Sequence, residues 1–125
     1  MENCVECMKS GIYKPGQGHH IISKKQAPYM RHVPIDIVPL CIHHHTSSPE
    51  GIHHNKEMML RYKQEFQLKL QLMFTKEYYT FKEIKELLEC SDNTVKAITK
   101  TMPRFKEGWE RERLIFHLCG DKNYL

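Results

Sequence analysis

The residues Ile35-Asp36-Ile37-Val38-Pro39-Leu40-Cys41-Ile42-His43-His44-His45 place a short apolar segment directly before a group of metal-ligand side chains. Alternating apolar residues in Ile35–Leu40 predict a short β-strand. Cys41 and His44 follow with two residues between them, a spacing at which one tight turn directs both side chains to one ion. The stretch therefore predicts a strand that ends in half of a metal site.

The other half is predicted near the start of the chain, where Cys4 and Cys7 have the same spacing. Together with Cys41 and His44 they would form a closed Cys3His zinc site, which ties the two segments together and contributes to folding. His43 could replace His44, but a pair with one intervening residue has poorer geometry. The alternative is that the first two cysteines are free thiols on a frayed terminus.

The composition of the chain favours metal binding over disulfides. The 125 residues include five cysteines and nine histidines, and 19 Lys plus Arg against 15 Asp plus Glu give a net charge of +4. Apolar residues make up 40% of the chain, too many for a disordered protein, and their runs are too short to span a bilayer. The first residues lack the pattern of a signal peptide. We therefore expect a cytosolic chain without membrane contact, in which cysteines more often bind metal.

Five further histidines gather around the same segment, and a closed structural site does not need them. They are His19, His20, His45, His53 and His54. This surplus indicates a second role. His20–Ser23 predicts another short strand, so two strands and a helix after Cys41 would give a β-β-α unit with histidines on its concave side.

Residues 55–76 predict a helix, because the segment lacks Gly and Pro and its apolar residues recur at about helical spacing. The recurring residues are Met59, Tyr62, Phe66, Leu70 and Phe74. This apolar stripe could pack inside the chain or pair two chains. A homodimer through this helix is therefore one expectation.

The C-terminal part predicts two short helices joined by a polar turn, as in a helix-turn-helix unit. Thr80 and Glu83 match a capping box at the start of the first helix, and Ser91 or Asp92 can cap the second. The buried face of the second helix would consist of Val95, Ile98 and Met102. Its exposed face would carry donors suited to phosphates and base edges, namely Asn93, Thr94, Lys96, Thr99 and Lys100.

After Pro103 the sequence predicts a short hairpin over Arg104–Trp109, followed by a last helix over Glu110–Cys119 that Gly120 stops. Cys90, Cys119 and His117 have no partner at metal spacing, so we expect them in or beside the core.

The order of the N-terminal features resembles the HNH, or ββα-metal, nuclease family over roughly residues 4 to 55. The matching features are the paired histidines before Ile21, the strand that contains Asp36 and ends in Leu40-Cys41, the Cys-x-x-His knuckle, and the histidines that follow it. The resemblance implies that His19 binds a catalytic divalent cation. It also implies that His20 is the general base that deprotonates water.

The same resemblance implies that His45 is a second ligand of the catalytic cation and that His53, or less favourably His54, is a third. Asp36 stands where the family has Asn, and we count it with His20 as an expected catalytic residue. A carboxylate can accept the backbone hydrogen bonds that fix the loop around the base but cannot donate them, and it could also approach the metal.

These residue types suit phosphodiester hydrolysis, which needs a base that works near neutral pH and a cation that neutralises charge on the phosphate. Imidazole ligands favour Ni2+ or Zn2+ by affinity, whereas Mg2+ or Mn2+ could also serve catalysis. We therefore expect two kinds of metal, one structural Zn2+ and one catalytic divalent cation.

Residues 79–120 are similar to the small winged helix-turn-helix domains of phage excisionases. This resemblance implies DNA contacts from Asn93, Thr94, Lys96, Lys100 and Arg104. The alternative is a plain helical hairpin that packs on the rest of the chain or forms a dimer interface.

Together these observations predict an α+β chain with three parts. They are an HNH nuclease domain with structural zinc over residues 1–56, a linking helix over 57–77, and a helix-turn-helix DNA-binding domain over 78–125. The expected function is that of a metal-dependent DNA endonuclease of a bacteriophage or mobile element, acting in the cytoplasm of a bacterial host cell. Alternatives are a non-catalytic zinc-containing DNA-binding regulator on the same scaffold and a phage inhibitor, for which the sequence contains no positive sign.

Overall fold

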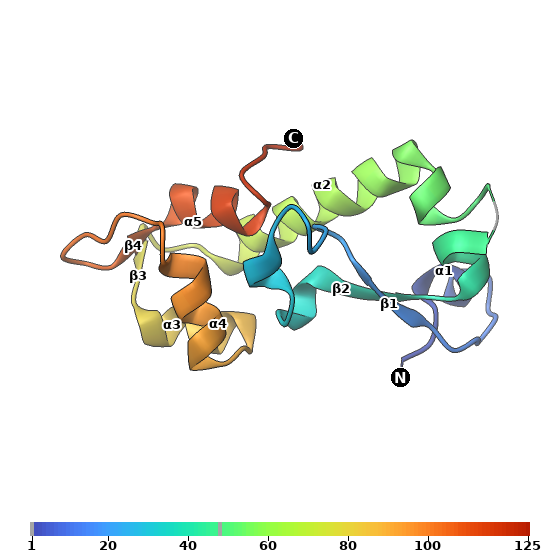
Figure 1. The fold of residues 1–125 in the computed structure, drawn as a ribbon, viewed down its shortest axis with the longest axis horizontal. Helices are drawn as coiled ribbons and strands as arrows, with labels where there is room; N and C mark the ends of the chain where they lie inside the picture. Colours follow the sequence, from blue (N-terminus) through green and yellow to red (C-terminus); the bar gives the residue numbers. More distant parts are fainter. Residues whose placement is uncertain (1, 48) are drawn as a thin grey trace.

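The computed structural model describes residues 2–47 and 49–125 and has a mixed α+β architecture. Figure 1 shows an elongated molecule in which α1, β1 and β2 lie toward one end and α3, α4, β3, β4 and α5 toward the other. The long helix α2 (Lys56–Met73) runs between these two ends. The predicted α+β class is confirmed.

The N-terminal half contains a short helix, α1 (Val5–Met8), and two antiparallel strands, β1 (Gln17–His20) and β2 (Ile37–Leu40). His19 pairs with Val38 and His20 with Ile37. A π-helical turn (His43–Ser47) and a 3-10 turn (Ile52–His54) then lead into α2. The turn and helix expected after Cys41 thus correspond to these two turns and α2, which begins at Lys56.

The predicted strand at His20–Ser23 is wrong, because β1 ends at His20 instead of beginning there. The carboxylate of Asp36 accepts a hydrogen bond from the backbone N–H of Ile22 at 2.8 Å, so a side chain takes the place of a strand partner. Pro34–Asp36 forms a 3-10 turn, which also shortens the predicted Ile35–Leu40 strand to four residues. Ile22 packs in the main core, and Ile21 and Ile35, which also suggested strands, pack against it.

Helix α2 joins two clusters of buried side chains. Asn55 caps its first turn by accepting a hydrogen bond from the Met58 N–H at 3.0 Å. Tyr62 packs in a small cluster around Cys4, Cys7 and Cys41, whereas Phe66 and Leu70 pack in the main core. The predicted stripe therefore packs inside the chain.

The C-terminal half contains β3 (Tyr78–Tyr79), α3 (Phe81–Leu88), α4 (Asp92–Thr99), β4 (Trp109–Glu110) and α5 (Arg111–Leu118). The predicted capping box is confirmed by the reciprocal hydrogen bonds of Thr80 and Glu83, and the Ser91 side chain caps α4. Val95 and Ile98 of α4 are buried as predicted, whereas Met102 lies beyond the end of the helix and is half-buried. In α3 the buried residues are Ile84 and Leu88.

The expected hairpin over Arg104–Trp109 is reduced to a tight turn with a single bridge between Phe105 and Gly108. Trp109 pairs instead with Tyr79 of β3. Gly108 has a φ of +121°, and a Cβ atom there would lie 2.2 Å from the Tyr79 carbonyl oxygen. Only glycine fits this close approach of two backbones.

The main core contains residues from both halves of the chain. Ile22, Met30 and Val33 pack in one cluster with the buried residues of α3, α4 and α5. The Arg111 guanidinium also binds the end of α2, donating to the Gln71 carbonyl at 2.9 Å and to the Phe74 carbonyl. Residues that the sequence assigned to separate parts therefore share one packed interior.

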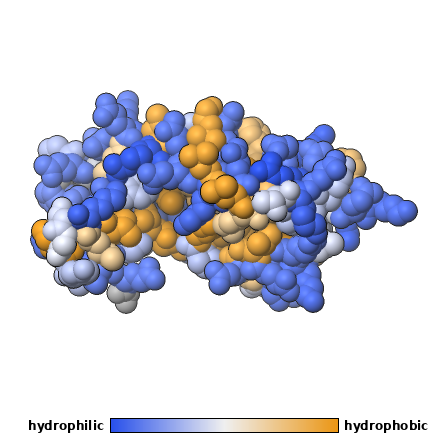
Figure 2. Space-filling model, turned by 180° about the vertical axis from the view of Figure 1, so that it is seen from behind, coloured by the Kyte–Doolittle hydropathy of each residue, from blue (hydrophilic) through white to orange (hydrophobic). Residues whose placement is uncertain are grey.

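Seen from behind, the surface is mostly hydrophilic, with apolar side chains gathered over its middle (Figure 2). Leu60, Leu68 and Leu72 of α2 are exposed. Among the residues that the structure describes, no helix combines the length and apolar character that crossing a membrane requires.

Candidate metal centres

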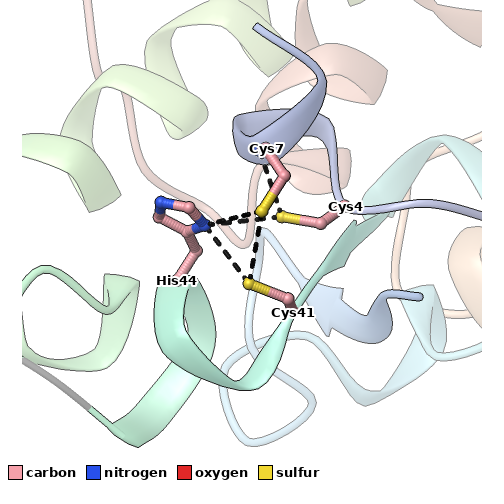
Figure 3. A group of neighbouring side chains, drawn as sticks. All are labelled: Cys4, Cys7, Cys41 and His44. Carbon is pink, nitrogen blue, oxygen red and sulfur yellow. Dashed lines mark hydrogen bonds between the residues drawn. The ribbon is translucent and has the colours of Figure 1, made fainter. Parts of the chain in front are cut away.

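Cys4, Cys7, Cys41 and His44 converge on one point at the end of the molecule that holds α1. Figure 3 shows the three sulfur atoms and the His44 Nδ1 atom turned toward one another. The Nδ1 atom lies 3.6, 3.5 and 3.3 Å from the sulfurs of Cys4, Cys7 and Cys41. This group could hold a metal ion, as the ligand spacing predicted, and His44 rather than His43 supplies the nitrogen.

The geometry of this group fits zinc. Tetrahedral bonds of about 2.3 Å to sulfur and about 2.0 Å to nitrogen place ligand atoms about 3.5–3.8 Å apart. The observed separations of 3.3 to 3.6 Å agree with that expectation. All three cysteines are buried, so the centre is closed, as structural zinc sites are.

The N-terminal knuckle is held on α2 by Glu6. Its carboxylate accepts hydrogen bonds from the Tyr62 hydroxyl at 2.5 Å and from Arg61 Nη2 at 3.2 Å. Burial alone would raise the pKa of Glu6, but hydrogen bonds from Lys9 and Tyr62 outweigh it and the pKa is lowered. The ionised Glu6 side chain therefore links α1 to α2.

A second convergent group consists of His19, His45 and His53, whose ligand nitrogens all lie within 4.8 Å of one another. His19 comes from β1, His45 from the π-helical turn and His53 from the 3-10 turn. The Nε2 atoms of His45 and His53 are 2.9 Å apart. Two nitrogens at that distance need a shared proton or a shared cation, and bonds of about 2.1 Å at right angles would place them about 3 Å apart.

Gln17 orients the ring of His45. The Gln17 side-chain oxygen lies 3.0 Å from His45 Nδ1 and can only accept, so Nδ1 carries the hydrogen and Nε2 keeps its lone pair. Burial, followed by the charges of His53 and His45, lowers the pKa of His19 to about 4. Burial and His53 also lower the pKa of His45. Neutral imidazoles are the form that binds metal.

His20 lies beside the three-histidine group, and the backbone orients its ring. Its Nε2 atom is 2.9 Å from the Arg31 carbonyl oxygen, which only accepts, so Nε2 donates and Nδ1 is left with a lone pair. His19 and His20 both line a pocket of about 360 Å3 together with His45 and His53. His20 thus lines the cavity with its ring held by the Arg31 carbonyl.

Asp36 is fully buried and lies outside the three-histidine group. Its Oδ1 atom accepts the Ile22 N–H, and its carbonyl accepts the Ile21 N–H at 2.8 Å, so it fastens the loop directly after His20. Of the two roles that the sequence left open, this geometry supports loop fixing rather than approach to the metal. Asp36 thus holds the backbone at Ile21 and Ile22.

We expect Asp36 to make stability depend on pH. Burial raises its pKa to about 7, although the Ile22 hydrogen bond acts in the opposite direction. The folded protein therefore binds one more proton than the unfolded chain between about pH 4 and pH 7, and stability falls as pH rises through that window. A shift of this size corresponds to an effect on the order of 4 kcal/mol.

The test is Asp36→Asn, whose amide does not titrate. The free energy of unfolding of the variant, relative to that of the natural chain, should rise by about 2–4 kcal/mol between pH 4.5 and pH 8. Denaturant unfolding in excess zinc measures it, with the exposed Glu65→Gln as control. A difference that stays constant with pH would contradict the raised pKa.

The remaining histidines near the site have other contacts. His54 Nε2 lies 2.9 Å from the Thr46 carbonyl, so His53 and not His54 joins the cluster. His43 pairs with Glu50 at 2.7 Å. His117, Cys119 and the half-buried Cys90 lie in or against the main core, as expected.

The residues predicted to contact DNA differ in their accessibility. Asn93, Lys96 and Lys100 are exposed on or beside α4, and the exposed Arg104 stacks over the Trp109 ring at 5.0 Å. The expectation for Thr94 is wrong, because its side chain is buried against the Ser91 hydroxyl. Thr99 is also buried and donates to the Val95 carbonyl, since a threonine one turn along can bond back to the helix.

Sequence reasoning missed three polar residues around the histidines. Gln17 lies two residues before His19 on β1, and this period of two was a signal for one face of a strand. Lys24 and Lys63 line the histidine pocket. Lys63 follows the lining residue Met59 by one helical turn, but only the fold places that face of α2 beside the histidines.

Comparison with family models, with curated proteins and with solved structures finds no match to this chain.

Proposed function

We propose that this protein is a metal-dependent DNA endonuclease of the HNH type, which hydrolyses phosphodiester bonds. The observation that carries the proposal is the convergence of three imidazoles from three separate segments in an open pocket, with His20 oriented beside them. A structural role would not need a second ligand group, because the cysteine-rich centre already ties the same segments together.

His19, His45 and His53 would hold the catalytic cation, which we expect to be Mg2+, Mn2+, Ni2+ or Zn2+. When bound, such an ion supplies positive charge that stabilises the phosphate and the leaving oxygen. The three residues supply at most three ligands, and the pocket beside them leaves room for phosphate oxygens and water.

His20 would take the proton of the attacking water. The Arg31 carbonyl fixes the ring and keeps the hydrogen on Nε2, so Nδ1 is the atom that accepts the proton. Asp36 holds the backbone at Ile21 and Ile22 and thereby limits the movement of His20. We therefore assign proton transfer to His20 and positioning to Asp36.

The C-terminal half would bind DNA through α4, in the manner of the winged helix-turn-helix domains that it resembles. Asn93, Lys96 and Lys100 are accessible for phosphate and base contacts, and Arg104 adds a further positive charge. A net charge of +4 is modest, so specific contacts must supply much of the affinity.

The proposed setting is a bacteriophage or mobile element in a bacterial host cell. Pairing of two chains stays a prediction and would place two sites on opposite strands. Because the stripe from Tyr62 to Leu70 is buried, a dimer through α2 would have to use the exposed Leu60, Leu68 and Leu72.

The proposal is tested by plasmid cleavage with each of the four cations, together with two neighbouring variants. His53→Ala removes an expected ligand, whereas the adjacent His54→Ala removes an exposed histidine outside the cluster. We expect His53→Ala to weaken binding of the second cation at least tenfold by calorimetry and to slow cleavage to a similar extent. His54→Ala should match the natural chain.

Absence of cleavage with every cation, with DNA binding intact, would contradict the nuclease proposal. That result would support the alternative of a non-catalytic zinc-containing DNA-binding regulator. Equal effects of His53→Ala and His54→Ala would contradict the ligand assignment alone.

A further inference from the structure

We infer that Lys63, held in place by Tyr124, forms with Lys24 a phosphate-binding site at the mouth of the histidine pocket. The site would bind a backbone phosphate of the DNA next to the bond that is cut, so the inference rests on the proposed function and extends it. It also brings the last residues of the chain, which have no expected catalytic role, into the nuclease site.

The pocket has the electrostatic character of an anion site. Its lining includes Lys24, Lys63 and the four histidines, and no Asp or Glu lines it within residues 2–47 and 49–125. None of the ion pairs found among the described residues involves Lys63, whereas Lys76, Lys82 and Lys85 each pair with a carboxylate. A cation without a counter-ion in a concave site attracts a phosphate.

Lys63 is half-buried rather than free in solvent. Burial and the nearby charge of Lys122 lower its pKa, and Lys63 in turn contributes to the lowered pKa of His19. Lys63 and His19 therefore line the same pocket, and the charge of Lys63 opposes protonation of His19. A phosphate on Lys63 would regain the Coulomb stabilisation that burial and Lys122 remove.

The aromatic ring of Tyr124 supports the Lys63 side chain. The lysine Nζ lies 5.2 Å from the centre of the tyrosine ring, within the range of a cation–π contact. An aromatic face stabilises an ammonium without neutralising it, whereas a carboxylate would compete with the phosphate. This support leaves the charge available to the ligand.

Three side-chain amides fix Tyr124 in this position. Gln64 donates to the Tyr124 carbonyl at 2.9 Å, Gln67 accepts from its N–H at 2.8 Å, and Gln26 donates to its hydroxyl at 3.1 Å. Gln67 also donates to the Asn123 side chain at 2.7 Å. Hydrogen bonds therefore hold residues 123 and 124 against α2, the helix that also carries Lys63.

The experiment measures DNA affinity without cleavage. A fluorescent duplex is titrated with protein that carries His20→Ala and one zinc per chain, without added cation, over a series of salt concentrations. We expect Lys63→Gln to weaken binding about five- to tenfold and to lower the salt-dependence slope by about 0.9, the value for one phosphate contact. Lys63→Arg should stay within about twofold, and the exposed Lys69→Gln serves as the matched control on α2.

Two substitutions of Tyr124 test whether its aromatic ring is needed for DNA binding, and a double variant tests whether it acts through Lys63. Tyr124→Phe keeps the ring and should bind normally, whereas Tyr124→Leu should weaken binding to about the same extent as Lys63→Gln. The double variant should be no weaker than Lys63→Gln alone, since Tyr124 acts through the lysine. Additive losses would show a merely structural role for Tyr124 and would overturn its part of the inference.

An unchanged affinity and slope in Lys63→Gln would overturn the phosphate site, even if the natural chain cuts DNA. Conversely, a natural chain that cuts no DNA would contradict the proposed function, while the slope still decides whether Lys63 binds phosphate. The two failures are therefore distinguishable. Thermal unfolding of Lys63→Gln should stay close to that of the natural chain, because Lys63 takes part in none of the ion pairs found among the described residues and loses a single weak cation–π contact with Tyr124.

Discussion

Replacing Cys41 by Ser should abolish cooperative folding of the N-terminal half. Cys41 supplies one of three sulfurs that surround the closed centre, and the elements around it are a four-residue helix and two four-residue strands. A two-stranded sheet is marginal in water by itself. Binding of structural zinc contributes on the order of 10 kcal/mol, which is comparable to the whole stability of a small domain.

Thermal unfolding with a metal assay measures this effect. We expect Cys41→Ser to bind less than one zinc per chain and to lose at least about 20 °C in Tm, a shift that several kcal/mol would produce. Cys90→Ser is the matched control, because Cys90 is a half-buried cysteine outside both ligand groups. The centre would not be structural if a chelator removed the metal without changing Tm.

The second large effect is expected at His20. His20→Ala should slow DNA cleavage about 10^2- to 10^4-fold, the usual contribution of a general base. The Arg31 carbonyl orients this ring and leaves Nδ1 basic, whereas alanine has no group that accepts the proton. Zinc content, binding of the second cation and DNA affinity should not change, because His20 belongs to neither ligand group.

Two further variants make the result at His20 specific. His20→Gln can place an amide donor near the position of Nε2, within reach of the Arg31 carbonyl, but lacks a basic nitrogen, so it should be as slow as His20→Ala. His32→Ala removes an exposed histidine outside the pocket and should cut normally. Cleavage by His20→Ala at the natural rate would rule out His20 as the base and leave the metal assignment to be judged separately.

Where the sequence predicted correctly, the signals were short-range. The spacing of Cys4 and Cys7, and of Cys41 and His44, reflects what a single turn can direct at one ion, so both pairs were readable without a fold. The caps at Thr80 and Ser91 are likewise local, because a side chain bonds the backbone three residues ahead. Helices α2, α3, α4 and α5 followed from such signals and from apolar spacing.

The errors arose where packing in the folded chain outweighed a local pattern. Ile21 and Ile22 have the pattern of a strand, but Asp36 binds both of their N–H groups and ends β1 before them. Thr94 looked like an exposed donor, yet it faces the interior beside Val95. Neither the strand end nor the buried threonine could be recognised without the packing partners.

The sequence by itself determined which residues can bind metal, and in which local pairs, because ligand chemistry and turn geometry depend on a few adjacent residues. Only the tertiary structure decided that His19, His45 and His53 meet while His54 does not. It also decided that Lys63 and Tyr124, 61 residues apart, lie together beside them. Such convergence depends on how α2 packs against both ends of the chain, and that packing is a collective result of one shared core.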